Sequence, residues 1–307
     1  MGSRLAFLGP EGTFTSEAAR LAAPDATREP LPTIEDVVDA VRDGRADLGV
    51  VPIENSIEGS VNLTLDALAF GAPGAFIRAE VALPISMNLL LKPGTSLEQV
   101  REVRSQPHAL AQCRQFLAAN LPAATVAAAT STAEAARQVA ESDGTVAALG
   151  TGLAAERYGL EIGVADIQDF AGNMTRFVVL SRRMAAASGA DKTSMVVFFG
   201  EDRPGLLLRI LDEFALRGIN LTKVESRPTK QQLGQYAIFL DAAGHPSEPR
   251  MAEALRSVHR HVAELRILGA YPRADGQASN AEPADSVQAY EGAGAWYQRL
   301  LEDVDST

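Results

Sequence analysis

The sequence has a single cysteine, Cys113, and only four histidines among its 307 residues. One cysteine cannot form an internal disulfide, which fits a reducing compartment, and we expect the chain to work in the cytoplasm. Apart from the weak pair His259 and His261, the histidines lack the spacing of metal ligands. We therefore expect no structural metal.

Long apolar runs and excess basic charge are also missing. The longest apolar stretch, VALPISMNLLL, is interrupted by Pro84, Ser86 and Asn88 and is shorter than the roughly 20 residues that a membrane helix needs. Asp and Glu outnumber Lys and Arg by 39 to 28. That balance argues against a nucleic acid or an anionic membrane as partner, because both require a basic patch. The first strand is expected to begin at RLAFLG, and no secretory signal is expected before it.

The composition, 46% hydrophobic and 22% charged, is typical of a globular protein. At 307 residues the chain is longer than a domain with a single hydrophobic core usually is, so we expect at least two domains. Residues 3–182 alternate short apolar strands with helical segments, which is typical of parallel sheets covered by helices. Extended stretches near residues 80–92 and at NMTRFVVL predict two crossings between two α/β lobes. A ligand would then lie in the cleft between the lobes.

The second half of the chain follows a different order. Residues 183–192 are small and polar and predict a linker, whereas residues 193–271 predict the strand and helix order βαββαβ of ferredoxin-like domains. Residues 272–307 are rich in acidic side chains and predict a partly disordered tail, in which Trp296 and Tyr297 could pin a short helix.

Two motifs could hold a ligand, although each also has a purely structural interpretation. GPEGTF, from Gly9 to Phe14, joins a strand to a helix, where backbone amides and the helix N-terminus favour an anion. A simple glycine turn would have the same sequence. VPIENS ends a buried strand with Glu54, Asn55 and Ser56, which could face the cleft or cap the next helix.

SQPHALAQC has a similar ambiguity. Ser105 could cap a helix whose first turn holds Pro107, and Gln112 follows two turns later on the same face. Both could address a ligand instead. We assign Cys113 to the body of that helix, as a packed side chain.

In NMTRF, polar residues precede a strand that is expected to be buried. Arg176 could bind a carboxylate through both guanidinium nitrogens while Thr175 presents a hydroxyl to a reacting oxygen. Equally, these residues could be the solvated start of a strand. Composition does not decide between the two interpretations.

Taken in order, these motifs together with STAEAA, VAALG and ERYGL resemble the prephenate dehydratase family across residues 4–180. The later RPGLLLRIL and GINLTKVESRP resemble the regulatory ACT domain that accompanies it. The resemblance implies an α/β protein with a two-lobed catalytic domain like periplasmic binding proteins, followed by a ferredoxin-like βαββαβ ACT domain.

The same resemblance implies a carbon–oxygen lyase that converts prephenate to phenylpyruvate, carbon dioxide and water in phenylalanine biosynthesis, without a cofactor. Thr175 would act at the leaving hydroxyl and Arg176 would bind a carboxylate of the substrate. Further catalytic residues implied by the match are Asn55, Ser105 and Gln112. The implied substrate-binding residues are Thr13, Glu54, Arg176 and Phe177.

The ACT resemblance implies feedback by L-phenylalanine at an interface between subunits, in a homodimer or homotetramer. The residues that match the two effector motifs are Gly205, Leu206, Asn220, Glu225, Ser226, Arg227 and Pro228. Glu225 and Arg227 could instead simply decorate a strand.

The chain departs from the family in two places. Gln106 and His108 stand where the family usually has histidine and glutamine, and Leu206 stands where it commonly has alanine. The first departure puts a role for a histidine at position 106 in doubt, and the second could reshape the effector pocket. Two other functions stay open, an arogenate dehydratase and a non-catalytic sensor of amino acids.

Overall fold

The computed structural model describes residues 2–200, 203–229, 235–277 and 283–303. The chain forms two compact units, one of residues 1–67 and 81–180 and the other of residues 68–80 and 181–307. Within the described residues, no helix is long and apolar enough to cross a membrane.

The first lobe of unit one is built on a sheet with the order β11-β3-β1-β2. Strand β1 runs parallel to β2 and β3, and β11 returns antiparallel to β3. The strands of this lobe are β1 (Arg4–Leu8), β2 (Thr27–Leu31), β3 (Leu48–Asn55), β4 (Gly59–Ser60) and β11 (Met174–Ser181), and its helices are α1 (Phe14–Ala22), α2 (Ile34–Arg42) and the start of α3 (Asn62–Phe70).

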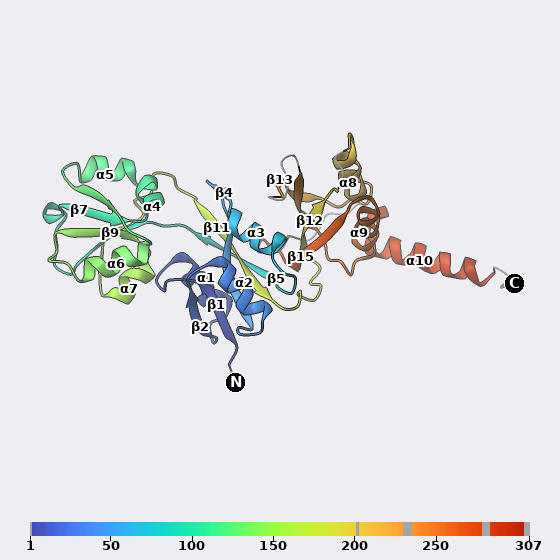
Figure 1. Ribbon diagram of the computed structural model, residues 1–307, viewed down its shortest axis with the longest axis horizontal. Helices are drawn as coiled ribbons and strands as arrows, with labels where there is room; N and C mark the ends of the chain where they lie inside the picture. Colours follow the sequence, from blue (N-terminus) through green and yellow to red (C-terminus); the bar gives the residue numbers. More distant parts are fainter. Residues whose placement is uncertain (1, 201–202, 230–234, 278–282, 304–307) are drawn as a thin grey trace. The chain divides into compact units, whose positions relative to one another are not determined.

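The second lobe of unit one has a five-stranded sheet with the order β10-β6-β9-β7-β8. Its strands are β6 (Asn88–Leu91), β7 (Glu102–Ser105), β8 (Thr125–Ala128), β9 (Val146–Gly150) and β10 (Glu161–Val164). Its helices are η1 (Leu97–Gln99), α4 (Pro107–Gln112), α5 (Arg114–Asn120), α6 (Thr132–Ala140) and α7 (Gly152–Tyr158). Figure 1 shows this lobe in green, joined to the blue lobe by two extended segments.

Those two segments are the predicted crossings. The outgoing one follows β5 (Phe76–Pro84), and the returning one enters β11. They run beside each other, since the Ile85 amide donates to the Asn173 carbonyl at 2.7 Å. The prediction of two α/β lobes is therefore confirmed, and the returning segment leads directly into the strand that carries Thr175.

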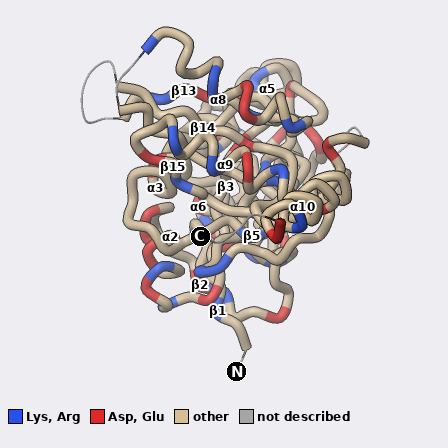
Figure 2. The backbone as a smooth tube through the Cα atoms, turned by 90° about the vertical axis from the view of Figure 1, so that its right-hand side faces the viewer, with Lys and Arg blue, Asp and Glu red and all other residues tan. Residues whose placement is uncertain are grey.

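Local sequence signals account for where helices begin. The hydroxyl of Thr33 accepts from the Asp36 amide at the start of α2, which satisfies one of the donors left open at a helix N-terminus. The apolar face of α2 is buried and its outer face carries charges of both signs. Near α2 in Figure 2, acidic and basic stretches lie next to each other along the chain.

Unit two contains the expected βαββαβ order, with an antiparallel sheet ordered β13-β14-β12-β15. The elements are β12 (Asp191–Phe198), α8 (Leu206–Ala215), β13 (Leu221–Pro228), β14 (Tyr236–Ala243), α9 (Pro249–His261) and β15 (Glu264–Pro272). Met195, Phe214, Leu240 and Met251 lie in the core between the sheet and the two helices. Strand β12 begins at Asp191, so the last two residues of the predicted linker already belong to a strand.

The tail differs from the expectation. After a short turn, η2 (Pro283–Asp285), residues Val287–Glu302 form the helix α10, whose N-cap Ser286 accepts from the Ala289 amide. Trp296 and Tyr297 are 59% and 51% exposed, so they do not pin this helix to a core. The sequence allowed a short helix here, and the one that forms spans Val287–Glu302 behind its capping Ser286. Predicted tail residues 278–282 and 304–307 lie outside the described residues.

Candidate active site

Strands β3 and β11 pair so that Thr175 lies opposite Asn55 and Arg176 lies opposite Glu54. Successive side chains of a strand point to opposite faces of the sheet, so the two pairs face different environments. Thr175, Asn55 and Phe177 line a cavity of 420 Å³ within unit one, whereas Glu54 and Arg176 are not among its lining residues. The pairing register thus selects which predicted residues reach the cavity.

Asn55 has a defined orientation because both ends of its amide are engaged. Its Oδ1 accepts from the backbone amides of Ile57 at 2.9 Å and Glu58 at 3.1 Å. Its Nδ2 therefore points the other way and donates to Asn173 Oδ1 at 2.7 Å and to Thr175 Oγ1 at 2.9 Å. Since the Thr175 oxygen already accepts this bond, the hydroxyl hydrogen is available to donate elsewhere.

Asn173 is a site residue that the sequence reasoning did not assign. It is buried, lines the cavity and accepts from Asn55. Ser56 supports the same arrangement, because its hydroxyl accepts from the Met174 amide at 2.9 Å. The sequence shows an asparagine two residues before Thr175. Its contact with Asn55 becomes visible only when the two strands are paired.

Two helix N-termini open onto the cavity. Thr13 caps α1, where its hydroxyl accepts from the Ser16 amide at 3.3 Å, and Ser131 caps α6 through the Glu134 amide at 3.0 Å. Both capping residues line the cavity. Because a helix N-terminus carries partial positive charge, the two together favour an anionic ligand.

Ser105 lies elsewhere. It is fully buried at the end of β7, and its hydroxyl donates to the Leu149 carbonyl at 2.8 Å. The N-cap of α4 is Gln106, so the expectation that Ser105 caps this helix is wrong. Ser105 is also absent from the cavity lining, unlike Gln106, His108 and Gln112.

Cys113 does not lie within the body of a helix as expected. It stands between α4 and α5, with φ −117° and ψ 17°. Its side chain is nevertheless packed as predicted, since it is fully buried in the core of the second lobe. Desolvation, and to a smaller extent the charge of Asp169, raise the pKa of this thiol to about 12.

Arg176 does not match the expectation that it reaches a ligand in the cleft. Its Nη2 donates to Glu54 Oε2 at 2.8 Å, on the face of the strand pair opposite Thr175. The guanidinium is mostly buried, whereas the Glu54 side chain is half-exposed. The two predicted substrate-binding residues therefore bind each other.

Several contacts join the two lobes of unit one, and the one between Gln112 and Glu58 lies at the cavity. The buried hydroxyl of Thr151 donates to the Gly12 carbonyl at 2.9 Å, and Arg157 forms an ion pair with Glu11. Gln112 Nε2 donates to Glu58 Oε1 at 2.9 Å. These contacts join the first lobe to helices of the second.

In unit two, three of the residues that match the effector motifs, Gly205, Leu206 and Ser226, line two neighbouring hollows. One, of 670 Å³, is lined by Gly205 and Leu206 together with four basic side chains, Arg203, Arg209, Arg260 and His261. Gly205 has φ +82°, a left-handed conformation that glycine adopts without strain. The other hollow, of 600 Å³, is lined by Ser226, Tyr236 and phenylalanine rings.

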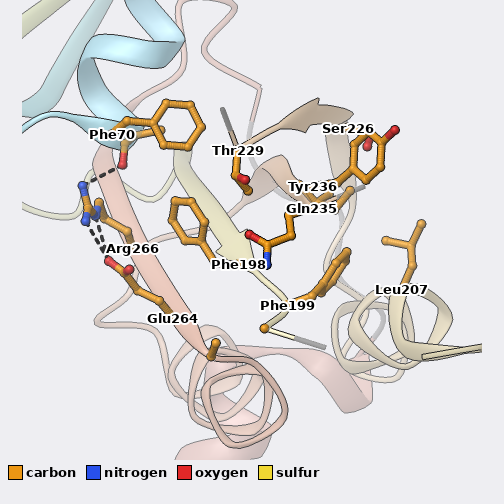
Figure 3. A pocket seen from close by; sticks show the side chains of 14 residues that line it. Phe70, Phe198, Phe199, Leu207, Ser226, Thr229, Gln235, Tyr236, Glu264 and Arg266 are labelled. Carbon is orange, nitrogen blue, oxygen red and sulfur yellow. Dashed lines mark hydrogen bonds and ion pairs between the residues drawn. The ribbon is translucent and has the colours of Figure 1, made fainter. Parts of the chain in front are cut away.

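Figure 3 shows this second hollow, with the rings of Phe70 and Phe198 near Arg266. The remaining effector candidates lie along or beside β13. Glu225 pairs with Lys223 at 3.1 Å and with Arg227 at 3.6 Å, the Asn220 carbonyl accepts from the Ala243 amide, and Pro228 ends the strand. Leu207 of the first motif and Ser226 of the second both line the hollow in Figure 3, whereas Gly205 and Leu206 line the other.

Comparisons with known proteins agree over nearly the whole chain. The family described as "Prephenate dehydratase" matches residues 5–185, and "ACT domain" matches residues 194–260. The prephenate dehydratase of Mycobacterium tuberculosis is 46% identical over 293 residues, which cover 91% of this chain and 89% of that protein.

Solved structures give the same picture. Prephenate dehydratase from Arthrobacter aurescens, in complex with L-Phe, is 42% identical with a TM-score of 0.89, and the match covers 97% of this chain and 99% of that one. A quorum-quenching acylase, GqqA, is 31% identical with a TM-score of 0.78, over 92% of this chain and 99% of that one.

Proposed function

The chain belongs to the prephenate dehydratase family, and from this premise we propose that its interlobe cavity converts prephenate to phenylpyruvate, carbon dioxide and water. The bond from the ring to its carboxylate breaks, and that electron pair enters the ring as the carbon–oxygen bond to the hydroxyl breaks. The aromatic ring that results drives the reaction. The departing hydroxide needs one proton to become water.

The hydrogen bond from Asn55 to Thr175 is the observation that carries this proposal. It fixes the threonine oxygen and directs the hydroxyl hydrogen toward the departing oxygen of the substrate. Thr175 then stabilises the leaving group and relays a proton from solvent to it. Acid assistance of this kind is typically worth about 100- to 10,000-fold in rate.

The substrate is a dianion, yet no lysine or arginine is among the cavity-lining residues of the described chain. We assign one of its carboxylates to the backbone amides and hydroxyls at the N-termini of α1 and α6, which include Thr13 and Ser131. Gln112 supplies an amide donor. Phe177 gives the ring an apolar surface.

The similarity to an acylase raises a second activity, because one fold can host different reactions. Hydrolysis of an acyl amide requires a nucleophile with an adjacent base. Here the described hydrogen-bond partner of Thr175 is the amide Nδ2 of Asn55, which donates and is not a base. The environment of Thr175 therefore favours a hydrogen-bond donor over a nucleophile.

For the second domain we propose feedback control by L-phenylalanine. The ACT match and the phenylalanine complex of the Arthrobacter relative support it. The effector residues would be Gly205, Leu206, Asn220 and the run Glu225–Pro228. Because one chain places Gly205 and Leu206 in one hollow and Ser226 in the other, we propose that pairing of chains in a homodimer or homotetramer completes the effector site. The reaction would take place in the cytoplasm.

An assay of the purified full-length protein tests both halves of the proposal. Phenylpyruvate should form from prephenate faster than phenylalanine forms from arogenate, and L-phenylalanine should change the rate and the oligomer size. Preference for arogenate would reassign the substrate. No turnover of either, with phenylalanine bound, would leave an amino-acid sensor, whereas turnover without any response to phenylalanine would overturn only the regulation.

A further inference from the structure

Three side chains meet at the edge of the cavity where the turn after β3 faces α4. His108 and Gln112 are four residues apart and lie on the same side of the helix. Glu58 approaches from the other lobe, where its Oε1 accepts from Gln112 Nε2 at 2.9 Å and forms an ion pair with His108 Nε2. All three residues line the cavity.

In the tautomer that carries hydrogen on Nε2, His108 and Gln112 both present a donor at this point. His108 Nε2 and Gln112 Nε2 lie 2.8 Å apart. An imidazole nitrogen that donates to Glu58 cannot at the same time accept from the amide of Gln112. Two donors therefore face each other, and the carboxylate of Glu58 satisfies both. If Glu58 left, another carboxylate could take its place without any other change in the two donors.

The charges of the cavity-lining residues also indicate that Glu58 competes with an anionic substrate. Among the described residues that line the cavity, Glu58 is the carboxylate and His108 is the side chain that can become cationic. A dianionic substrate would meet the negative charge of Glu58 inside a cavity whose helix N-termini otherwise attract it. Glu58 opposes binding for as long as it occupies the two donors.

The position of Glu58 allows it to leave. Its side chain is 43% exposed, on a turn that continues into Gly59 with φ +82°. The backbone amide of Glu58 is held by Asn55 Oδ1, so a rotation of the side chain alone frees the donors. A carboxylate that swings into water is not left buried and unpaired. Asn55 and Thr175 keep their bond throughout.

We propose that Glu58 is a built-in carboxylate that occupies the subsite of one substrate carboxylate and is displaced when prephenate binds. His108 and Gln112 are the donors of that subsite, and His108 stands where the family commonly has glutamine. This inference rests on the proposed function. It makes Glu58 a competitor for the substrate, which acts on binding and leaves the chemical step alone.

Steady-state kinetics with prephenate test this directly. Glu58→Gln replaces the competing charge with a weaker acceptor, so KM should fall about three- to tenfold, with kcat changed less than twofold. His108→Gln should raise KM about tenfold, also with little change in kcat. In the double variant, the effect of Glu58→Gln should shrink, because both residues act through the same contact.

Glu156→Gln is the matched control. Glu156 is exposed on α7, outside the cavity lining, and its loss removes the same formal charge. A rise in KM for Glu58→Gln, an unchanged KM for His108→Gln, or an equal fall in KM for Glu156→Gln would each overturn the inference. If the wild type makes no phenylpyruvate, the proposed function itself fails, which is distinguishable because no KM is then defined.

Discussion

Asn55 and Thr175 are 120 positions apart in the chain, and the amide of the first donates to the hydroxyl of the second at 2.9 Å. The contact forms because β3 and β11 pair antiparallel with these residues opposite each other. Two backbone amides orient Asn55 from the other side. The hydroxyl of Thr175 is therefore positioned by the sheet, before any ligand arrives.

Replacing Asn55 by aspartate should reverse this hydrogen bond. A carboxylate at position 55 accepts, so the Thr175 hydroxyl would donate to it and no longer to the substrate. We expect kcat for prephenate to fall by about 100-fold, with KM changed much less, since the interaction is used mainly in the transition state. Stopped-flow or steady-state assays of phenylpyruvate measure both constants. A kcat close to the wild-type value would show that Asn55 does not control the hydroxyl.

Arg176→Gln tests the face of the strand pair that points away from the cavity. The ion pair with Glu54 is partly exposed, so its loss should lower the free energy of unfolding by only about 1 kcal/mol. We expect KM for prephenate to stay within twofold of the wild type. Chemical denaturation and kinetics on the same preparation check both values, with Glu54→Gln as the partner control. A tenfold rise in KM restricted to the arginine variant would restore a carboxylate-binding role for Arg176.

Arg176 also shows how far the sequence could go. The position of NMTRF at a crossing between the lobes was predicted from the sequence. The alternation of side chains along β11 then places Thr175, and not Arg176, at the cavity. The pairing register of β3 and β11 cannot be predicted from the sequence, because more than a hundred residues separate the two strands. The same limit hid Asn173, whose partner is Asn55.

Other differences have equally local causes. Ser105 looks like a helix cap in the sequence, but the carbonyl of Leu149 on a neighbouring strand is the acceptor that it meets. No sequence pattern links Glu58 to His108, because they meet only where a turn of one lobe contacts a helix of the other. The lobes and the βαββαβ domain were predictable because their apolar periodicity is continuous.

The thiol of Cys113 should be inert in the folded protein. Burial raises its pKa to about 12, whereas an exposed cysteine titrates near 8.5. At pH 8 the thiolate fraction should be lower than that of a free thiol by on the order of 10³-fold. Ellman's reagent should therefore label the native protein only as fast as it unfolds, and label it at once in guanidinium chloride. Rapid stoichiometric labelling of the native protein would contradict the packing described for this residue.

If the hydroxyl of Thr175 carries the chemical step, a comparison of two substitutions at this position reveals it most directly. We would measure kcat for phenylpyruvate formation from prephenate in the wild type, Thr175→Ser and Thr175→Ala. Thr175→Ser keeps the hydroxyl and should keep measurable turnover, whereas Thr175→Ala should lose about 100- to 10,000-fold in kcat while still binding prephenate. An alanine variant that makes phenylpyruvate at the wild-type rate would contradict the account.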